Sequence, residues 1–116
     1  MNASRRQKRV ASLIKEELSR LLIETIQDSS SGLITVTRVE MTPDLKTARI
    51  FFSIYGAEQE EAILEMLERK KGYLRKSIAS KVKLKYNPML IFSLDPSADF
   101  QERIERLLKD RKKNGQ

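Results

Sequence analysis

The sequence contains no cysteine and no histidine. Without cysteine the chain can form neither a disulfide nor a thiolate metal site, which agrees with a reducing cytoplasm. Without histidine it lacks the commonest general base near neutral pH and the commonest protein metal ligand. These absences argue against an enzyme, and we expect no catalytic residue, no bound metal and no cofactor.

Long apolar runs are also missing. No segment approaches the roughly 20 apolar residues that a membrane-spanning helix needs. The N-terminus is basic, but Lys15, Glu16 and Glu17 interrupt the apolar stretch that follows it, so we predict neither a signal peptide nor a membrane helix. Hydrophobic residues still make up 40% of the 116 residues. That fraction predicts one globular domain, which we expect to be a cytoplasmic monomer.

Charge is segregated along the chain. Residues 69–85 carry eight cationic side chains and no acidic one, whereas residues 58–68 carry five glutamates. A separate basic patch is typical of proteins that bind a polyanion. A second cationic group lies where the first helix should begin, although positive charge there opposes the helix dipole. The basic stretch contains Arg69, Lys70, Lys71, Arg75, Lys76, Lys81, Lys83 and Lys85, and the N-terminal group contains Arg5, Arg6, Lys8 and Arg9.

Apolar residues at helical spacing predict two helices in the first two thirds of the chain. The first covers about residues 5–27, and Ser4 and Gln7 can form a capping box at its start. The second covers residues 58–71, with its acidic residues early and its basic residues late, as the helix dipole favours.

Two further helices follow. Gly72 predicts a helix break, because glycine has no Cβ to restrict the backbone, and the third helix covers about residues 73–82. Asp95 can cap a last helix, which has an apolar stripe and ends in a basic tail. We assign this helix and tail to residues 97–116, and the main domain to residues 1–96.

Three strands are predicted between these helices. Residues 33–42 form the first, and its alternation slips, which indicates a bulge near Thr37 or Arg38. Residues 45–55 form the second, and the short turn between them implies an antiparallel pair. Residues 83–94 form the third.

The parity of the third strand assigns its faces. Tyr86 shares the parity of the apolar residues and is therefore expected in the core, while Lys83 and Lys85 point away from it. Pro88 cannot donate a ladder hydrogen bond and marks an edge strand or a bulge. The whole pattern predicts a two-layer α+β domain, with helices packed on a three-stranded sheet.

The predicted order αββααβ matches the type II KH domain, an RNA-binding fold. Several stretches go further and resemble the ribosome-binding factor A family over about residues 5–110. No single motif is very specific, but their order and spacing are. The matching residues are Arg9-Val10; Leu33 to Thr37 with Val39; Asp44-Leu45 with Ala48; Gly72 with Leu74-Arg75; and Pro88, Leu90, Phe92, Asp95 and Ser97.

One departure from ordinary KH domains is plain. These domains bind single strands through a GXXG loop, and the chain has no such motif. The family that it resembles uses a helix kink of small-x-Gly character instead, and this motif falls on Lys70-Lys71-Gly72. Gly72 agrees with the family, whereas Lys70 replaces the usual small residue.

The resemblance implies an assembly factor without catalysis. Such a factor binds the immature small ribosomal subunit near the 5′ end and decoding region of its 16S rRNA, assists precursor processing and matters for growth in the cold. We expect contact through phosphates and shape, and no small-molecule substrate or membrane. The predicted RNA-binding residues are Lys70, Lys71, Arg75, Lys76, Lys83 and Lys85, with Arg5, Arg6, Lys8 and Arg9 as a second patch, and Gly72 is the predicted kink.

Other interpretations stay open at this point. The basic stretch could be a solvated surface, or it could steer the chain onto an acidic ribosomal protein or assembly factor. A nuclease built on Asp28, Asp44, Asp95 or Asp99 is disfavoured, because these acids are scattered and fit turn and cap roles. Binding of the last helix to an anionic membrane would use an apolar stripe that the core can also claim.

Overall fold

The computed structural model describes residues 3–25, 33–55 and 60–95. These residues form α1 (Arg5–Thr25), β1 (Leu33–Met41), β2 (Thr47–Tyr55), α2 (Glu60–Arg69), α3 (Lys71–Lys81) and β3 (Met89–Leu94). The predicted α+β class and element order are therefore confirmed. The predicted last helix and tail lie outside the described residues.

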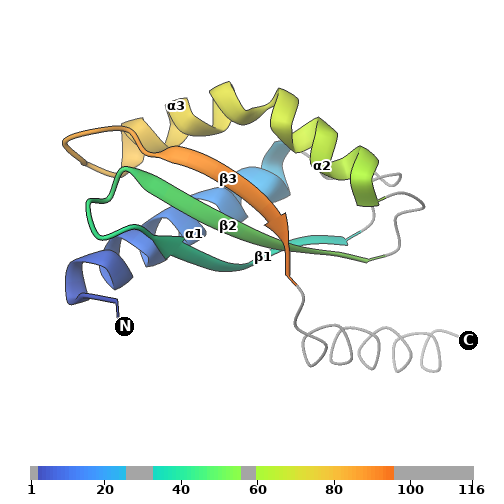
Figure 1. The fold of residues 1–116 in the computed structure, drawn as a ribbon. Coiled ribbons are helices and arrows are strands. Elements are labelled where there is room, and N and C mark those ends of the chain that lie inside the picture. Colours follow the sequence, from blue (N-terminus) through green and yellow to red (C-terminus); the bar gives the residue numbers. More distant parts are fainter. Residues whose placement is uncertain (1–2, 26–32, 56–59, 96–116) are drawn as a thin grey trace, which may run out of the picture.

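The three strands form one sheet in the order β1-β2-β3 (Figure 1). β1 and β2 are antiparallel, as the short turn between them predicted, and β3 runs parallel to β2. The register of β1 shifts between Val36 and Arg38, which confirms the predicted bulge. A parallel neighbour requires a crossover connection, and α2 and α3 supply it.

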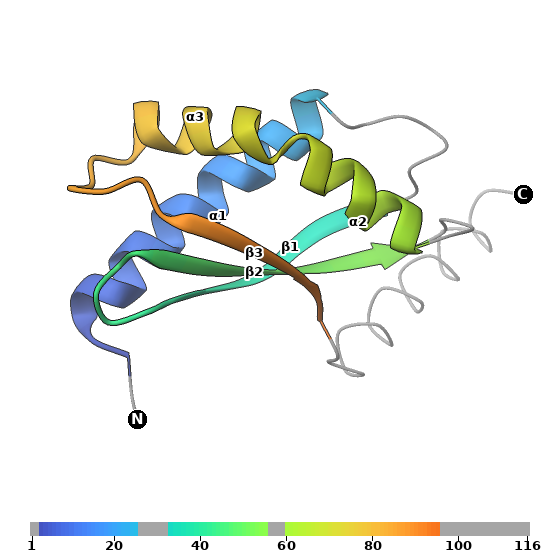
Figure 2. The same cartoon turned by 45° about the horizontal axis from the view of Figure 1, so that its top comes forward.

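The helices cover one face of the sheet (Figures 1 and 2). Apolar side chains from this face and from all three helices form a single core. The ring of buried Phe52 meets that of partly buried Phe92 edge to face, with centroids 5.3 Å apart. No helix in the described ranges has both the length and the apolar character to cross a bilayer. The most buried large side chains are Ile14, Leu18, Ile50, Phe52, Leu67, Leu74, Ile78, Pro88 and Leu90.

α1 begins at the predicted capping box. The Ser4 N–H donates to Gln7 Oε1 at 2.8 Å, and the Gln7 N–H donates to Ser4 Oγ at 3.1 Å. The Gln7 side chain also donates from Nε2 to the carbonyl oxygen of Met41 at 2.9 Å. This last bond joins the cationic start of α1 to the end of β1.

The turn between β1 and β2 is closed by side chains as well as backbone. The Thr42 hydroxyl donates to Asp44 Oδ1 at 2.7 Å, and the Lys46 N–H donates to the same oxygen at 3.0 Å. Thr42 and Thr47 also pair through their backbones. β2 therefore begins at Thr47 and not at residue 45 as predicted. Leu45 adopts a φ of 61° within the turn, and its side chain is buried in the core.

The start of β3 was wrongly predicted. Residues 83–88 form an irregular connection, and the strand begins at Met89, whose N–H donates to the carbonyl oxygen of Lys46 at 2.8 Å. Pro88 has no N–H to donate, so pairing starts only after it. The parity drawn through Pro88 was therefore invalid, and Tyr86 is 55% exposed and not in the core.

Candidate nucleic-acid interface

The basic stretch occupies three structural settings. Lys70 lies at the junction of α2 and α3, Arg75 and Lys76 lie on α3, and Lys83 and Lys85 lie in the connection before β3. α3 has 11 residues, so at about 1.5 Å per residue it separates the two ends of the stretch by roughly 16 Å. The eight cations therefore lie in a row along the length of α3 and its two flanks, and not in a compact cluster.

Arg75 is held by the chain itself. Its Nε donates to the carbonyl oxygen of Pro88 at 3.1 Å, and its Nη2 donates to that of Asn87 at 3.2 Å. Asn87 Nδ2 in turn donates to the carbonyl oxygen of Arg75 at 3.2 Å. The side chain thus fastens the irregular connection to α3, and no salt bridge joins it to an acid of α2 in the described part of the chain.

Lys71 is also engaged internally. Its ammonium group lies 2.6 Å from Glu68 Oε2 and 4.9 Å from the ring centroid of Phe92. Its side chain is 28% exposed. Because Lys71 already has a carboxylate and an aromatic ring as partners, we expect it to bind a phosphate less strongly than the unpaired lysines of the basic stretch do.

Five cations of the basic stretch are exposed to solvent, and three of them, Lys76, Lys83 and Lys85, are predicted RNA-binding residues. Lys76 projects from α3, and Lys83 and Lys85 project from the connection that follows it. No carboxylate pairs with any of the three within the residues that the structure describes. Their positive charge is therefore available to an external polyanion.

The N-terminal group meets the end of this row. Arg6, on α1, lines a hollow of about 230 Å³ together with Asp44 of the β1–β2 turn and Lys85 of the α3–β3 connection. The three segments come together at the left of Figure 1. Lys8 lines a different, wider hollow along β1, while Arg5 and Arg9 are exposed on α1. Arg6 and Lys85, one from each patch and about 80 residues apart in sequence, thus line one hollow.

Tyr86 and Lys46 also belong to this end, and sequence reasoning missed both. Tyr86 lines the same hollow, and the ammonium groups of Lys46 and Lys85 each lie 5.5 Å from its ring centroid. Pro88 could have indicated the exposure of Tyr86. Proline interrupts the pairing of a strand, so the alternation of buried and exposed residues after Pro88 does not extend to the residues before it.

A sequence profile described as "Ribosome-binding factor A" matches residues 6–108. The chain belongs to the ribosome-binding factor A family. Ribosome-binding factor A of Brevibacillus brevis is 44% identical over 103 residues, which cover 88% of this chain and 85% of the relative.

Solved structures show the same fold. The crystal structure of ribosome-binding factor A from Thermus thermophilus superposes with a TM-score of 0.66 and 23% identity, over 76% of this chain and 94% of that one. A Thermus thermophilus homology model fitted into a cryo-electron microscopy map of a complex of the 30S subunit with ribosome-binding factor A gives a TM-score of 0.60 and 22% identity, over 79% and 93% of the two chains.

The helix junction of this ribosome-binding factor A family member differs from the sequence-based expectation. The break between α2 and α3 falls on Lys70, with φ −91° and ψ 3°, and α3 begins at Lys71. Gly72 therefore lies within the first turn of α3 and not at the break. Its φ is not positive, and a Cβ built on it would meet nothing within 4 Å. No contact in the described chain requires glycine at this position.

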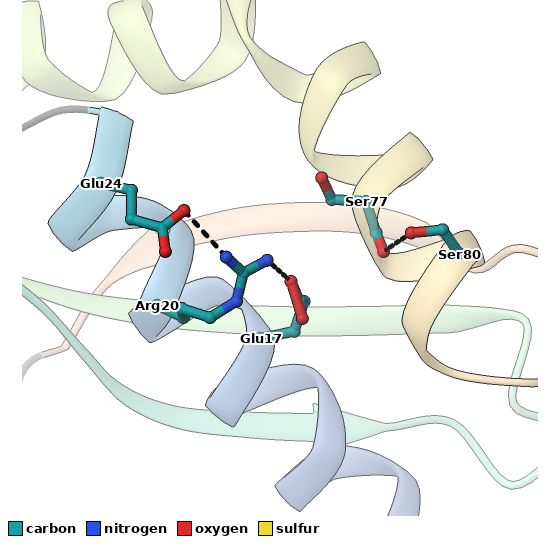
Figure 3. A network of polar contacts seen from close by, with 5 residues as sticks. All are labelled: Glu17, Arg20, Glu24, Ser77 and Ser80. Carbon is teal, nitrogen blue, oxygen red and sulfur yellow. Dashed lines mark hydrogen bonds and ion pairs between the residues drawn. The ribbon is translucent and has the colours of Figure 1, made fainter.

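Two glutamates of α1 pair with an arginine of the same helix (Figure 3). The Arg20 guanidinium of α1 donates to Glu17 and, at 2.8 Å, to Glu24, and these hydrogen bonds to the two carboxylates raise the pKa of Arg20. On neighbouring α3, the Ser80 hydroxyl donates to the carbonyl oxygen of Ser77 at 2.9 Å. Across the described ranges, no three acidic side chains converge in a way that could hold a metal ion.

Proposed function

We propose that this family member binds the immature small ribosomal subunit and assists its late maturation and the processing of precursor rRNA, without catalysing a reaction itself. The proposed contact lies near the 5′ end and decoding region of the 16S rRNA. The family carries ribosome binding in its name, and one structural relative was fitted into the map of a complex with the 30S subunit. We extend to this chain both the ribosome binding in the family's name and the 30S subunit as its partner.

The observation that carries the proposal is a set of cations, without carboxylate partners among the described residues, that runs from α3 to the hollow lined by Arg6 and Lys85. Lys76, Lys83 and Lys85 have no carboxylate partner in the described part of the chain, and Arg6 lies beside Lys85. Lys and Arg bind RNA by neutralising phosphates and releasing counterions. We assign phosphate contact to these residues, with Lys70, Arg5, Lys8 and Arg9 at the margins, and we assign Arg75 and Lys71 mainly to positioning.

The remaining assignments follow from the same proposal. A factor that acts on ribosome precursors works in the bacterial cytoplasm, needs no cofactor or small-molecule substrate, and has no membrane partner. We take it to be a monomer with a KH-like RNA-binding domain and a separate terminal segment, residues 97–116. A strain that lacks the protein should accumulate precursor 16S rRNA, most strongly in the cold.

Co-sedimentation with immature and mature small subunits across a salt series tests the proposal. Contact by about five cations predicts a log–log salt slope of about −3 to −5. Lys76→Glu and Lys83→Glu should each weaken binding and lower the slope, whereas Lys15→Glu, an exposed α1 lysine outside both patches, should change it little.

Preference for the immature particle, lost in the two patch variants, supports the proposed function. Equal binding to both particles and to unrelated RNA would leave only a general RNA-binding domain. A slope near zero would rule out the electrostatic contact, and association that survives ribonuclease treatment would favour an acidic protein partner instead.

A further inference from the structure

Tyr86 is an exposed aromatic side chain bordered by positive charge. Its side chain lies in the irregular connection between α3 and β3 and is 55% exposed. The ammonium groups of Lys46 and Lys85 each lie 5.5 Å from the ring centroid. Cation–π contacts extend to about 6 Å, so both are at the weak end of the range. The lysines thus hold charge over the ring, while the residue as a whole stays 55% exposed to solvent.

The ring forms part of the hollow described above, which we call the Tyr86 hollow. Its volume is about 230 Å³, smaller than the roughly 300–1,000 Å³ typical of sites for drug-sized ligands. It accepts one small planar group and not a helix or a duplex. The lining residues are Arg6, Pro43, Asp44, Leu45, Leu84, Lys85 and Tyr86.

The charge of the Tyr86 hollow favours an anion. Arg6, Lys46 and Lys85 bring three positive charges to it, and Asp44 brings one negative charge, which leaves a net +2. Asp44 Oδ1 already accepts hydrogen bonds from the Thr42 hydroxyl and the Lys46 N–H. An aromatic face beside excess positive charge matches a nucleotide, which has a flat base and an anionic phosphate.

We propose that Tyr86, Lys46, Lys85 and Arg6 form a subsite for one unpaired nucleotide of an RNA single strand. The base stacks on the Tyr86 ring, and the adjoining phosphate lies among the three cations. Stacking accepts any base, so the subsite recognises the unpaired state and not the sequence. The inference rests on the proposed function, because it names the kind of RNA that this end of the molecule takes.

The segments that form the subsite are held in place before any ligand arrives. Arg75 fastens Asn87 and Pro88, which follow Tyr86, to α3. The Thr42–Asp44 bond fixes the turn that carries Lys46. A preformed site loses less conformational entropy on binding, so a single stacked base can contribute measurable affinity.

Binding of a short single-stranded RNA of mixed sequence, compared with a duplex of the same sequence, tests the subsite in the full chain. Removal of one base–aromatic stack should weaken single-strand binding by about five- to 150-fold in Tyr86→Ala. Tyr86→Phe keeps the ring and should bind as the native chain does. Tyr86→Leu keeps apolar bulk but not the ring, and should lose affinity as Tyr86→Ala does.

Tyr73 provides the matched control. It is 53% exposed on α3, close to the exposure of Tyr86, but no cation of the described residues lies over its ring. Tyr73→Ala should leave single-strand affinity within about twofold, and Tyr86→Ala should leave duplex affinity unchanged. Circular dichroism of each variant checks that the fold is kept.

The subsite would be overturned if Tyr86→Ala and Tyr86→Leu bound single-stranded RNA with native affinity, or if the native chain did not bind single-stranded RNA. It would also be overturned if Tyr73→Ala lost as much single-strand affinity as Tyr86→Ala, or if Tyr86→Ala lost duplex affinity equally. If Tyr86→Ala weakens only co-sedimentation with the subunit, the ring contacts a protein and the subsite is again wrong. If the native chain does not bind small subunits but binds single-stranded RNA in a way that depends on Tyr86, the proposed function is wrong and the subsite is supported.

Discussion

Arg75 and Pro88 are joined across 13 positions of the chain by a hydrogen bond of 3.1 Å from the guanidinium Nε to the carbonyl oxygen. Pro88 is among the most buried residues, and Asn87 beside it accepts a second bond from the same guanidinium. Arg75 therefore sets the path of the segment that carries Lys83, Lys85 and Tyr86. Arg75 thus has a structural role, which its positive charge within a basic stretch did not indicate.

Arg75→Ala should destabilise the fold. It removes two hydrogen bonds from a charged donor and leaves the Pro88 carbonyl without this partner, which should cost about 1–3 kcal/mol in the free energy of unfolding. Lys76→Ala, at the next and exposed position, should change stability by less than about 0.5 kcal/mol. Urea denaturation measures both.

The same pair of variants separates positioning from phosphate contact. Lys76→Ala should reduce the salt slope of subunit binding by about 1, and Arg75→Ala should leave the slope unchanged. An unaltered unfolding midpoint in Arg75→Ala would contradict the positioning role, and a slope reduced as in Lys76→Ala would mean that the guanidinium binds phosphate directly.

Gly72→Ala should stabilise the free protein. Gly72 has ordinary helical surroundings and open space around it, so alanine should raise the free energy of unfolding by about 0.4–1 kcal/mol. Ala79→Gly, at an exposed position of the same helix, should lower it by a similar amount.

Subunit affinity of Gly72→Ala should fall although its stability rises, because a glycine that the fold does not need leaves room for close approach of RNA backbone. Co-sedimentation of Gly72→Ala and the native chain at one salt concentration measures this. Unchanged affinity would remove any role for Gly72 in the interface, and lower stability would mean that the helix junction depends on it.

Local features of the fold were predictable because their causes lie within a few residues. Ser4 and Gln7 are three positions apart, so the capping box is visible in the sequence. The bulge at Thr37 follows from a slip in alternation within one strand.

Features that depend on distant residues were not predictable in the same way. The partners of Arg75 lie 12 and 13 positions away in an irregular segment, and Lys71 meets Phe92 only through packing of α3 on the sheet. Tyr86 was misplaced because alternation was extended through Pro88. The meeting of Arg6 with Lys85 depends on how α1 lies beside the connection, which charge counting cannot reveal.

Asp44 should make stability depend on pH. The Thr42 hydroxyl and the Lys46 N–H donate to its carboxylate and hold its pKa below the ordinary 3.8. A carboxyl group with a lowered folded pKa stabilises the fold above the unfolded pKa, and the contribution disappears as pH falls through the folded value. Asp44→Asn should therefore be less stable than the native chain near neutral pH, and the difference should shrink below about pH 4.

Thermal unfolding at a series of pH values measures the Asp44 effect. Glu65→Gln, at an exposed position of α2 with no polar partner among the described side chains, serves as the control and should show no such trend. A stability difference that stays constant from neutral to acid pH would show that the Asp44 charge does not stabilise the turn.

The Glu17–Arg20 pair should contribute more to stability than the Arg20–Glu24 pair. The Glu17 side chain is 8% exposed and that of Glu24 is 58% exposed. Arg20→Ala leaves a nearly buried carboxylate without its cation, so we expect a larger loss in the free energy of unfolding than Glu24→Ala causes. Glu24→Ala removes only a surface ion pair and should cost less than about 1 kcal/mol.

A double variant distinguishes the stabilisation by the Glu17–Arg20 ion pair from the cost of leaving Glu17 buried and unpaired. Glu17→Met/Arg20→Ala removes both charges, and it should recover much of the stability that Arg20→Ala loses, because replacing a buried ion pair by apolar groups is often neutral. Urea denaturation gives the three values, and subunit binding should be native in every variant because Arg20 is already paired. If the double variant is no more stable than Arg20→Ala, the loss comes from the packing of the arginine stem over α1 and not from an unpaired Glu17.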